Sequence, residues 1–212
     1  MNNVLAMDFF KNMAKSKDNN PNSVKLAHNT NCTVIDAKFI LKYTDSNSKI
    51  LDIGTGSGLI INLIYDKVKS IDCIEPYKEF TKFIVKSDNI LIHNCNIFDY
   101  KTDKFFDIVT SFGTMHYFNE NEAFEIYKIV YSMLKVGGKF IIKNQFGIYD
   151  DVDVSGYSEE QKTEYFAQYR YIDKEINMLK GIGFKNISKY DIYPAEINRW
   201  DNTHFWAIAM EK

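Results

Sequence analysis

The spacing of apolar residues divides this chain near residue 48. In residues 1–20 and 34–43 the apolar side chains recur every three or four positions, which predicts two helices joined by a polar loop. From residue 49 onward, short apolar runs of strand length alternate with stretches of helical spacing. We therefore expect an N-terminal helical cap over residues 1–48 and one α/β domain over residues 49–212.

Seven of the short apolar runs have the length of strands. They cover residues 49–53, 70–74, 90–93, 106–110, 139–143, 187–193 and 205–210. Helices separate most of them; in residues 120–134 the side chains expected to face the core are Ala123, Phe124, Tyr127, Val130 and Leu134. This alternation predicts a mostly parallel sheet with helices on both faces. Residues 145–172, rich in acidic and aromatic side chains, interrupt it, so we expect them to form a lid inserted over the sheet edge.

A glycine-rich turn follows the first of these strands. Its residues are Asp52, Gly54, Thr55, Gly56 and Gly58. Glycine allows a positive φ angle and lets a ligand approach the backbone closely, and the first crossover of a parallel sheet is a common nucleotide site. A dinucleotide motif, G-x-G-x-x-G, would need its third glycine at Leu59, and the Gly-Lys-Ser/Thr of a phosphate-binding loop is absent. The spacing therefore argues against NAD.

An acidic residue, Glu75, ends the second strand, 21 residues after Gly54. A carboxylate at this place can accept hydrogen bonds from both hydroxyls of a ribose. Pro76 follows it, at a position where proline commonly begins a helix. The glycine turn and Glu75 together predict a site for a cofactor that contains a nucleoside.

Three segments resemble the motifs of class I S-adenosylmethionine-dependent methyltransferases: D-x-G-x-G-x-G at residues 52–58, the run 111–113 after the fourth strand, and Gly137-Gly138 before the fifth. The resemblance implies a Rossmann-like sheet of seven strands with an antiparallel last strand. It also implies S-adenosylmethionine as cofactor and S-adenosylhomocysteine as product. Asn96 stands where the family has an acid on the adenine amino group, and an Asn carbonyl accepts the same hydrogen bond. The implied cofactor-binding residues are Asp52, Gly54, Thr55, Gly56, Gly58, Glu75, Pro76, Asn96, Ile97, Ser111, Phe112 and Gly113.

Two histidines are candidate bases for the methyl transfer that this resemblance implies. His116 follows the fourth strand and His28 lies in the N-terminal segment, and histidine titrates in the useful range. An in-line displacement mainly requires alignment of the two reactants and exclusion of water, so we expect no larger catalytic group. We also expect no metal, because Ser111, Lys143 and Asn144 stand where a magnesium catechol-type enzyme has acids.

Only two of the 26 basic residues are arginines, Arg170 and Arg199, and both fall in segments that can line an acceptor pocket. Arginine binds phosphate and carboxylate groups bidentately, which favours a small anionic acceptor. Asn144 and Tyr117 complete the expected acceptor-binding residues. The flanks of the chain also resemble methyltransferases of bacterial capsule decoration, including those for methyl phosphoramidate, which implies a role there or in secondary-metabolite biosynthesis.

Several activities stay open at this point. O-methylation of a small molecule is the leading interpretation. N-methylation of a small amine, an NAD-dependent oxidoreductase on a Rossmann-like fold and a non-catalytic binding module are the alternatives. The intact glycines and Glu75 argue against the last of these, because a module without a cofactor would not need them.

Charge and composition limit the partners and the location. The formal net charge is −2 and no basic stripe is present, which argues against nucleic acid as a partner. No apolar run is long enough to cross a membrane, and the N-terminus lacks the pattern of a signal peptide. Three cysteines without metal-ligand spacing fit a reducing compartment. We therefore expect a cytoplasmic enzyme with a small-molecule acceptor, and a homodimer is an open alternative to a monomer.

Overall fold

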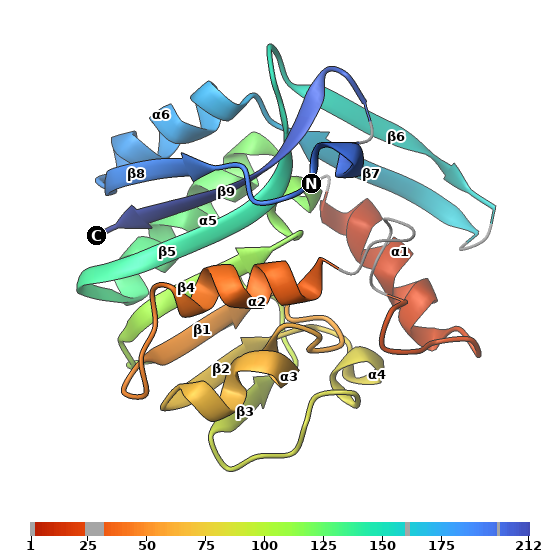
Figure 1. The fold of residues 1–212 in the computed structure, drawn as a ribbon. Coiled ribbons are helices and arrows are strands. Elements are labelled where there is room, and N and C mark those ends of the chain that lie inside the picture. Colours follow the sequence, from red (N-terminus) through yellow and green to blue (C-terminus); the bar gives the residue numbers. More distant parts are fainter. Residues whose placement is uncertain (1–2, 24–31, 160–161, 199) are drawn as a thin grey trace.

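A seven-stranded sheet lies at the centre of the molecule, in the order β3-β2-β1-β4-β5-β9-β8 (Figure 1). The computed structural model describes residues 3–23, 32–159, 162–198 and 200–212. The strands are β1 (Lys49–Ile53), β2 (Ser70–Ile74), β3 (Ile90–His93), β4 (Phe106–Phe112), β5 (Leu134–Gly147), β8 (Lys185–Tyr190) and β9 (Thr203–Glu211). Neighbouring strands are parallel, except that β9 pairs antiparallel with β5 and with β8. This confirms the expected Rossmann-like, mostly parallel sheet with an antiparallel last strand.

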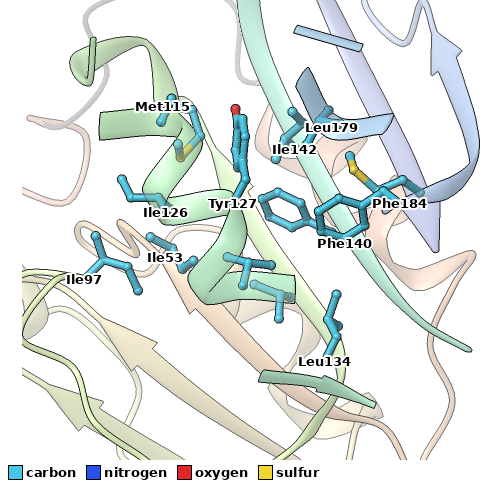
Figure 2. Packing of buried hydrophobic residues seen from close by; sticks show 14 of the residues in the cluster. Ile53, Ile97, Met115, Ile126, Tyr127, Leu134, Phe140, Ile142, Leu179 and Phe184 are labelled. Carbon is cyan, nitrogen blue, oxygen red and sulfur yellow. The ribbon is translucent and has the colours of Figure 1, made fainter. Parts of the chain in front are cut away.

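Helices cover both faces of the sheet, because its strands carry apolar side chains on both sides. The longer helices that pack on it are α2 (Thr33–Leu41), α5 (Glu120–Met133) and α6 (Ile172–Ile182). The shorter helical segments between the strands are α3 (Ile61–Ile64), η1 (Tyr65–Lys67), α4 (Lys78–Thr81), η2 (Met115–Tyr117) and η3 (Ala195–Ile197). Ile50 of β1 belongs to the core under α2 and α3, whereas the next residue, Leu51, belongs to the core under α5 and α6. Figure 2 shows this second core, where Tyr127 of α5 packs beside Phe140 of β5.

A capping box begins α5. Asn119 Oδ1 accepts a hydrogen bond from the Glu122 N–H at 3.0 Å, and Glu122 Oε2 accepts one from the Asn119 N–H at 3.0 Å. The expectation that Phe124 faces the core is wrong, since 38% of its surface is exposed. Ile126 faces the core instead, because it lies three residues after the buried Ala123 and so on the same side of the helix.

The segment expected to be an insertion begins inside a strand. β5 runs past residue 143 to Gly147, because residues 139–147 all pair with β9. An antiparallel hairpin of β6 (Val152–Ser158) and β7 (Thr163–Tyr169) follows, and it packs against α1 (Asn3–Lys15). Figure 1 shows α1 beside this hairpin, away from α2. The two helices of the N-terminal segment therefore have different packing partners: α2 packs on the sheet, and α1 packs against the hairpin. The division at residue 48 and the role of the hairpin as a lid stay predictions.

Candidate functional site

A cavity of about 620 Å³ opens at the carboxyl ends of the parallel strands. The turn after β1 and the ends of β2, β4 and β5 form its floor. Side chains from α1, β7 and the loop containing η3 form its walls. This is the edge of an open α/β sheet at which ligands bind, because the loops that follow adjacent parallel strands diverge there. Two of the expected site residues, His28 and Arg199, lie outside the described residues.

The glycine turn after β1 brings its backbone to the cavity. Gly54, Gly56 and Gly58 have φ angles of 74°, 58° and 74°, which other residue types rarely adopt. A Cβ atom at Gly54 would lie 2.2 Å from Thr114 Oγ1, so glycine is required there for packing as well. Gly54, Thr55 and Gly56 line the cavity. Gly58 is not among the lining residues, and a Cβ atom there would lie 2.5 Å from Ile84 Cγ1.

Asp52, which lines the cavity before this turn, ties the end of β1 to β4. Its Oδ1 accepts a hydrogen bond from Thr110 Oγ1 at 2.5 Å, and its carbonyl oxygen accepts one from Thr55 Oγ1 at 3.2 Å. Burial raises the pKa of the carboxyl, and the hydrogen bond from Thr110 acts against that rise. Asp52 therefore helps to hold the turn in the shape that exposes its backbone.

Glu75, which directly follows β2, is hydrogen-bonded to the backbone of the glycine turn. Its Oε2 accepts the Gly56 N–H at 3.0 Å and its Oε1 accepts the Tyr77 N–H at 3.1 Å. Each carboxylate oxygen has a second lone pair, and the side chain lines the cavity beside Pro76. Burial raises the pKa of Glu75 to about 7, while the two backbone N–H groups oppose the rise.

The raised pKa of Glu75 predicts a pH dependence of stability in the ligand-free protein. Between about 4.5, its ordinary pKa, and about 7 the folded protein keeps a proton that the unfolded chain has lost. Raising the pH across this window therefore lowers the free energy of unfolding. We expect the midpoint of thermal unfolding to fall with pH more steeply in the wild type than in Glu75→Gln, which cannot titrate. The slopes are compared rather than single midpoints, because Gln offers only one oxygen to the two N–H groups; equal slopes would contradict the assignment.

Asn96 and Ile97, which follow β3, also line the cavity, and their role in binding a cofactor stays a prediction. Asn96 Oδ1 accepts the Phe98 N–H at 3.2 Å, and Asn96 Nδ2 lies 3.9 Å from the sulfur of Met7. Tyr77 donates a hydrogen bond to the carbonyl oxygen of Met7 at 2.5 Å. These contacts fasten α1 across this end of the cavity.

Of the three residues 111–113 at the end of β4 that were expected to bind the cofactor, two line the cavity. Phe112 and Gly113 line the cavity, and the Gly113 N–H donates to the Lys143 carbonyl at 2.7 Å. Ser111 lies fully buried below them, and its Oγ makes no hydrogen bond to another described residue. Ser111 is therefore placed to support the floor rather than to touch a ligand.

His116 and Tyr117 stand on η2, which follows β4, and both line the cavity. His116 Nδ1 lies 3.3 Å from Asn144 Oδ1, and its ring centroid lies 4.2 Å from that of Tyr117. Asn144 itself is 1% exposed and is not part of the cavity wall. It is therefore placed to orient His116 rather than to contact an acceptor.

Arg170 lies outside the cavity, contrary to its expected acceptor-binding role. Its Nε donates to Glu175 Oε2 at 2.6 Å, and the whole side chain is 2% exposed. Its other nitrogens donate to the carbonyl oxygens of Phe118 and Met115 at 2.7 and 3.0 Å. A guanidinium engaged in this way has no access to a ligand, so Arg170 holds η2, and with it His116, against the start of α6.

Three residues that are not among the expected site residues meet at the β5 end of the cavity. Lys143 Nζ lies 3.5 Å from Asp36 Oδ2, and the Tyr193 hydroxyl donates to Asp36 Oδ1 at 2.6 Å. Burial and the neighbouring Asp36 raise the pKa of Tyr193 far above its ordinary value, so the phenol stays a donor. Asp36 lies on α2, Lys143 on β5 and Tyr193 after β8. The one signal in the sequence for this group is that Lys143 and Tyr193 lie near the ends of expected strands.

Metal-binding and membrane-spanning features are absent from the part of the chain that the structure describes. Among those residues, no three His, Cys, Asp or Glu side chains gather as metal ligands would. None of the described helices is long and apolar enough to cross a membrane.

Comparison with known proteins finds similarity to methyltransferases in sequence and in fold. Residues 50–138 match the family model described as a methyltransferase domain. An uncharacterized methyltransferase of Staphylococcus carnosus (strain TM300) is 24% identical over 149 residues, covering 65% of this chain and 70% of that protein. Among solved structures, DhpI in complex with SAH has a TM-score of 0.73 at 12% identity, with 100% of this chain and 98% of that chain covered. The N-methyltransferase NodS from Bradyrhizobium japonicum WM9, in complex with S-adenosyl-L-homocysteine, has a TM-score of 0.69 at 11% identity, with 97% and 98% covered.

Proposed function

We propose that this chain, whose residues 50–138 match the methyltransferase-domain model, transfers the methyl group of S-adenosylmethionine to a small acceptor, leaving S-adenosylhomocysteine. The observation that carries the proposal is the placement of Glu75. Its two oxygens are held by the N–H groups of Gly56 and Tyr77, and each keeps a lone pair for a ribose hydroxyl. The backbone of the glycine turn lies directly beside it and leaves room for the rest of the cofactor.

The residues around Glu75 and the glycine turn fit the remaining parts of the cofactor. Asn96 and Ile97 lie next to Glu75, where an adenine attached to that ribose would be bound by an amide and an apolar side chain. The turn from Gly54 to Gly56 and Asp52 lie on the opposite side, toward β4. When bound, the cofactor would supply a methyl group attached to a positively charged sulfur. A nucleophile can displace the sulfur from this methyl group without help from a metal.

The chain itself contributes alignment, exclusion of water and a base. α1 and β7 cover the cavity with Phe10, Tyr165 and Tyr169, which keep water from the reacting atoms. If the proton on His116 is donated from Nδ1 to Asn144 Oδ1, Nε2 is the basic nitrogen and can take a proton from an acceptor hydroxyl. A histidine base in this position supports our proposal that the methyl group is transferred to an oxygen atom. The context expected from the flanks, capsule decoration or secondary metabolism, stays a prediction.

Thermal unfolding with S-adenosylhomocysteine and with NAD tests the proposal. A ligand at 100 times its Kd adds about 2.7 kcal/mol to the free energy of unfolding, so the midpoint should rise with S-adenosylhomocysteine and not with NAD. Stabilisation by NAD alone would overturn the assignment and favour an oxidoreductase. Transfer of a labelled methyl group to a panel of small hydroxyl and amino compounds then separates O- from N-methylation.

A further inference from the structure

Lys143 lies in the half of the cavity that the cofactor residues leave open. Its strand, β5, is separated from the glycine turn by β4, and Lys143 pairs in register with Phe112 near the end of β4. Adjacent strands lie about 4.8 Å apart, so Lys143 is roughly 10 Å from β1, on the side away from Glu75. We call this region, formed by the end of β5 and the loop after β8, the acceptor half.

The ammonium of Lys143 faces the cavity among aromatic rings. The side chain is only 12% exposed, and Nζ lies 5.6, 5.1 and 6.0 Å from the ring centroids of Phe112, Tyr193 and Phe205. Among the described residues that line the cavity, Lys143 is the single Lys or Arg. Burial of a cation raises the free energy of the folded protein unless oxygen atoms accept hydrogen bonds from its N–H groups. The contacts that Lys143 makes within the protein therefore determine whether it can also bind a ligand.

Among the residues that the structure describes, none accepts a hydrogen bond of ordinary length from the ammonium of Lys143. The nearest carboxylate oxygen within the described structure, Asp36 Oδ2, is 3.5 Å away, whereas a charge-assisted N–H···O bond spans about 2.7–2.9 Å. Asp36 is instead held by the Tyr193 hydroxyl at 2.6 Å. Asp36 therefore acts as a fixed counter-ion that offsets the charge of Lys143 but leaves donors directed to whatever fills the acceptor half.

We propose that Lys143 binds an anionic oxygen group of the acceptor, a phosphate, phosphonate or carboxylate, so that the opposite end of the acceptor reaches His116 and Gly113. This inference rests on the proposed function and names the substrate class. Aromatic side chains around the ammonium exclude water from the contact and strengthen it. The carboxylates of Asp36 and of Glu196, which also lines the cavity, work against an anion, so removal of Asp36 should improve binding rather than abolish it.

The test uses the protein saturated with S-adenosylhomocysteine and two probes, inorganic phosphate and acetate, titrated by calorimetry at constant ionic strength. We expect at least one probe to bind the wild type, at least tenfold weaker binding in Lys143→Met, and tighter binding in Asp36→Asn. Whichever probe binds more tightly separates phosphoryl from carboxylate acceptors. Lys189→Met is the matched control, because it removes a lysine that lies 4.1 Å from the Trp206 ring on exposed β8, outside the cavity.

The affinity for S-adenosylhomocysteine keeps this proposal separate from the proposed function. It should be the same in the wild type and in Lys143→Met, since β4 separates Lys143 from the glycine turn and Glu75. Failure of S-adenosylhomocysteine to bind the wild type would refute the proposed function itself. If the cofactor product binds but neither anion does, or if Lys143→Met binds the anions as well as the wild type, the anion site is refuted. Tetramethylammonium, titrated in the same way, serves as a control of opposite charge. If it binds and the anions do not, the anion site is refuted and a cationic acceptor is indicated.

Discussion

Arg170→Met is expected to lower the free energy of unfolding by about 3–5 kcal/mol, because it leaves the carboxylate of Glu175 buried without its cation. Glu175 is fully buried, and its other partner is the Tyr127 hydroxyl. The carbonyl oxygens of Met115 and Phe118 lose their donors in the same variant. Urea unfolding followed by circular dichroism measures the change.

Two controls show whether the lost charge pair causes this effect. The double variant Arg170→Met with Glu175→Met should recover most of the stability, since replacing a buried pair by apolar residues is often close to neutral. It also provides the measurement if the single variant does not fold. Lys128→Met removes an exposed partner of Glu125 and should cost less than about 1 kcal/mol. A single variant that loses no more than Lys128→Met would show that Arg170 is not needed to hold η2.

Glu75→Ala is expected to weaken the binding of S-adenosylhomocysteine by at least about 100-fold. Hydrogen bonds to a charged group contribute about 1.5–3 kcal/mol each, and the carboxylate is placed to accept two from the ribose. The variant also removes the acceptor for the Gly56 and Tyr77 N–H groups, which loosens the turn beside the cofactor. Isothermal titration calorimetry at pH 8, above the raised pKa of about 7, measures the wild type with its carboxylate charged.

Matched variants separate the ribose contact from the loss of a negative charge. Glu75→Gln keeps one carbonyl oxygen and should fall between the wild type and the alanine variant. Asp88→Ala removes an acid from the exposed loop before β3 and should leave the affinity unchanged. An unchanged affinity in a folded Glu75→Ala protein would mean that the ribose lies elsewhere, and the orientation of the cofactor would have to be reversed.

Local backbone requirements made the position of the glycine turn predictable from the sequence. The φ angles of the turn demand glycine, and glycine spacing is visible in any sequence. Glu75 was predictable because a parallel sheet brings the carboxyl ends of its strands to one edge, so an acid that ends the second strand must lie beside the turn. Helix spacing was less reliable at single positions, as Phe124 shows, because neighbouring residues on a helix differ by only about 100° in direction.

The sequence by itself determined the order of the elements, the glycine turn and its acid, since these depend on local conformation and on the topology of the sheet. The tertiary structure decided what the charged residues do. Arg170 looked like an anion ligand until its partners proved to be carbonyl groups 52 and 55 residues away and a buried Glu175. In the sequence, Lys143 was notable only because it replaces an acid of magnesium-dependent enzymes. Its partners became visible when α2 and the loop after β8 brought Asp36 and Tyr193, 157 residues apart, to its side. The role of a charge depends on its burial and on its partners, and both arise only when distant segments pack together.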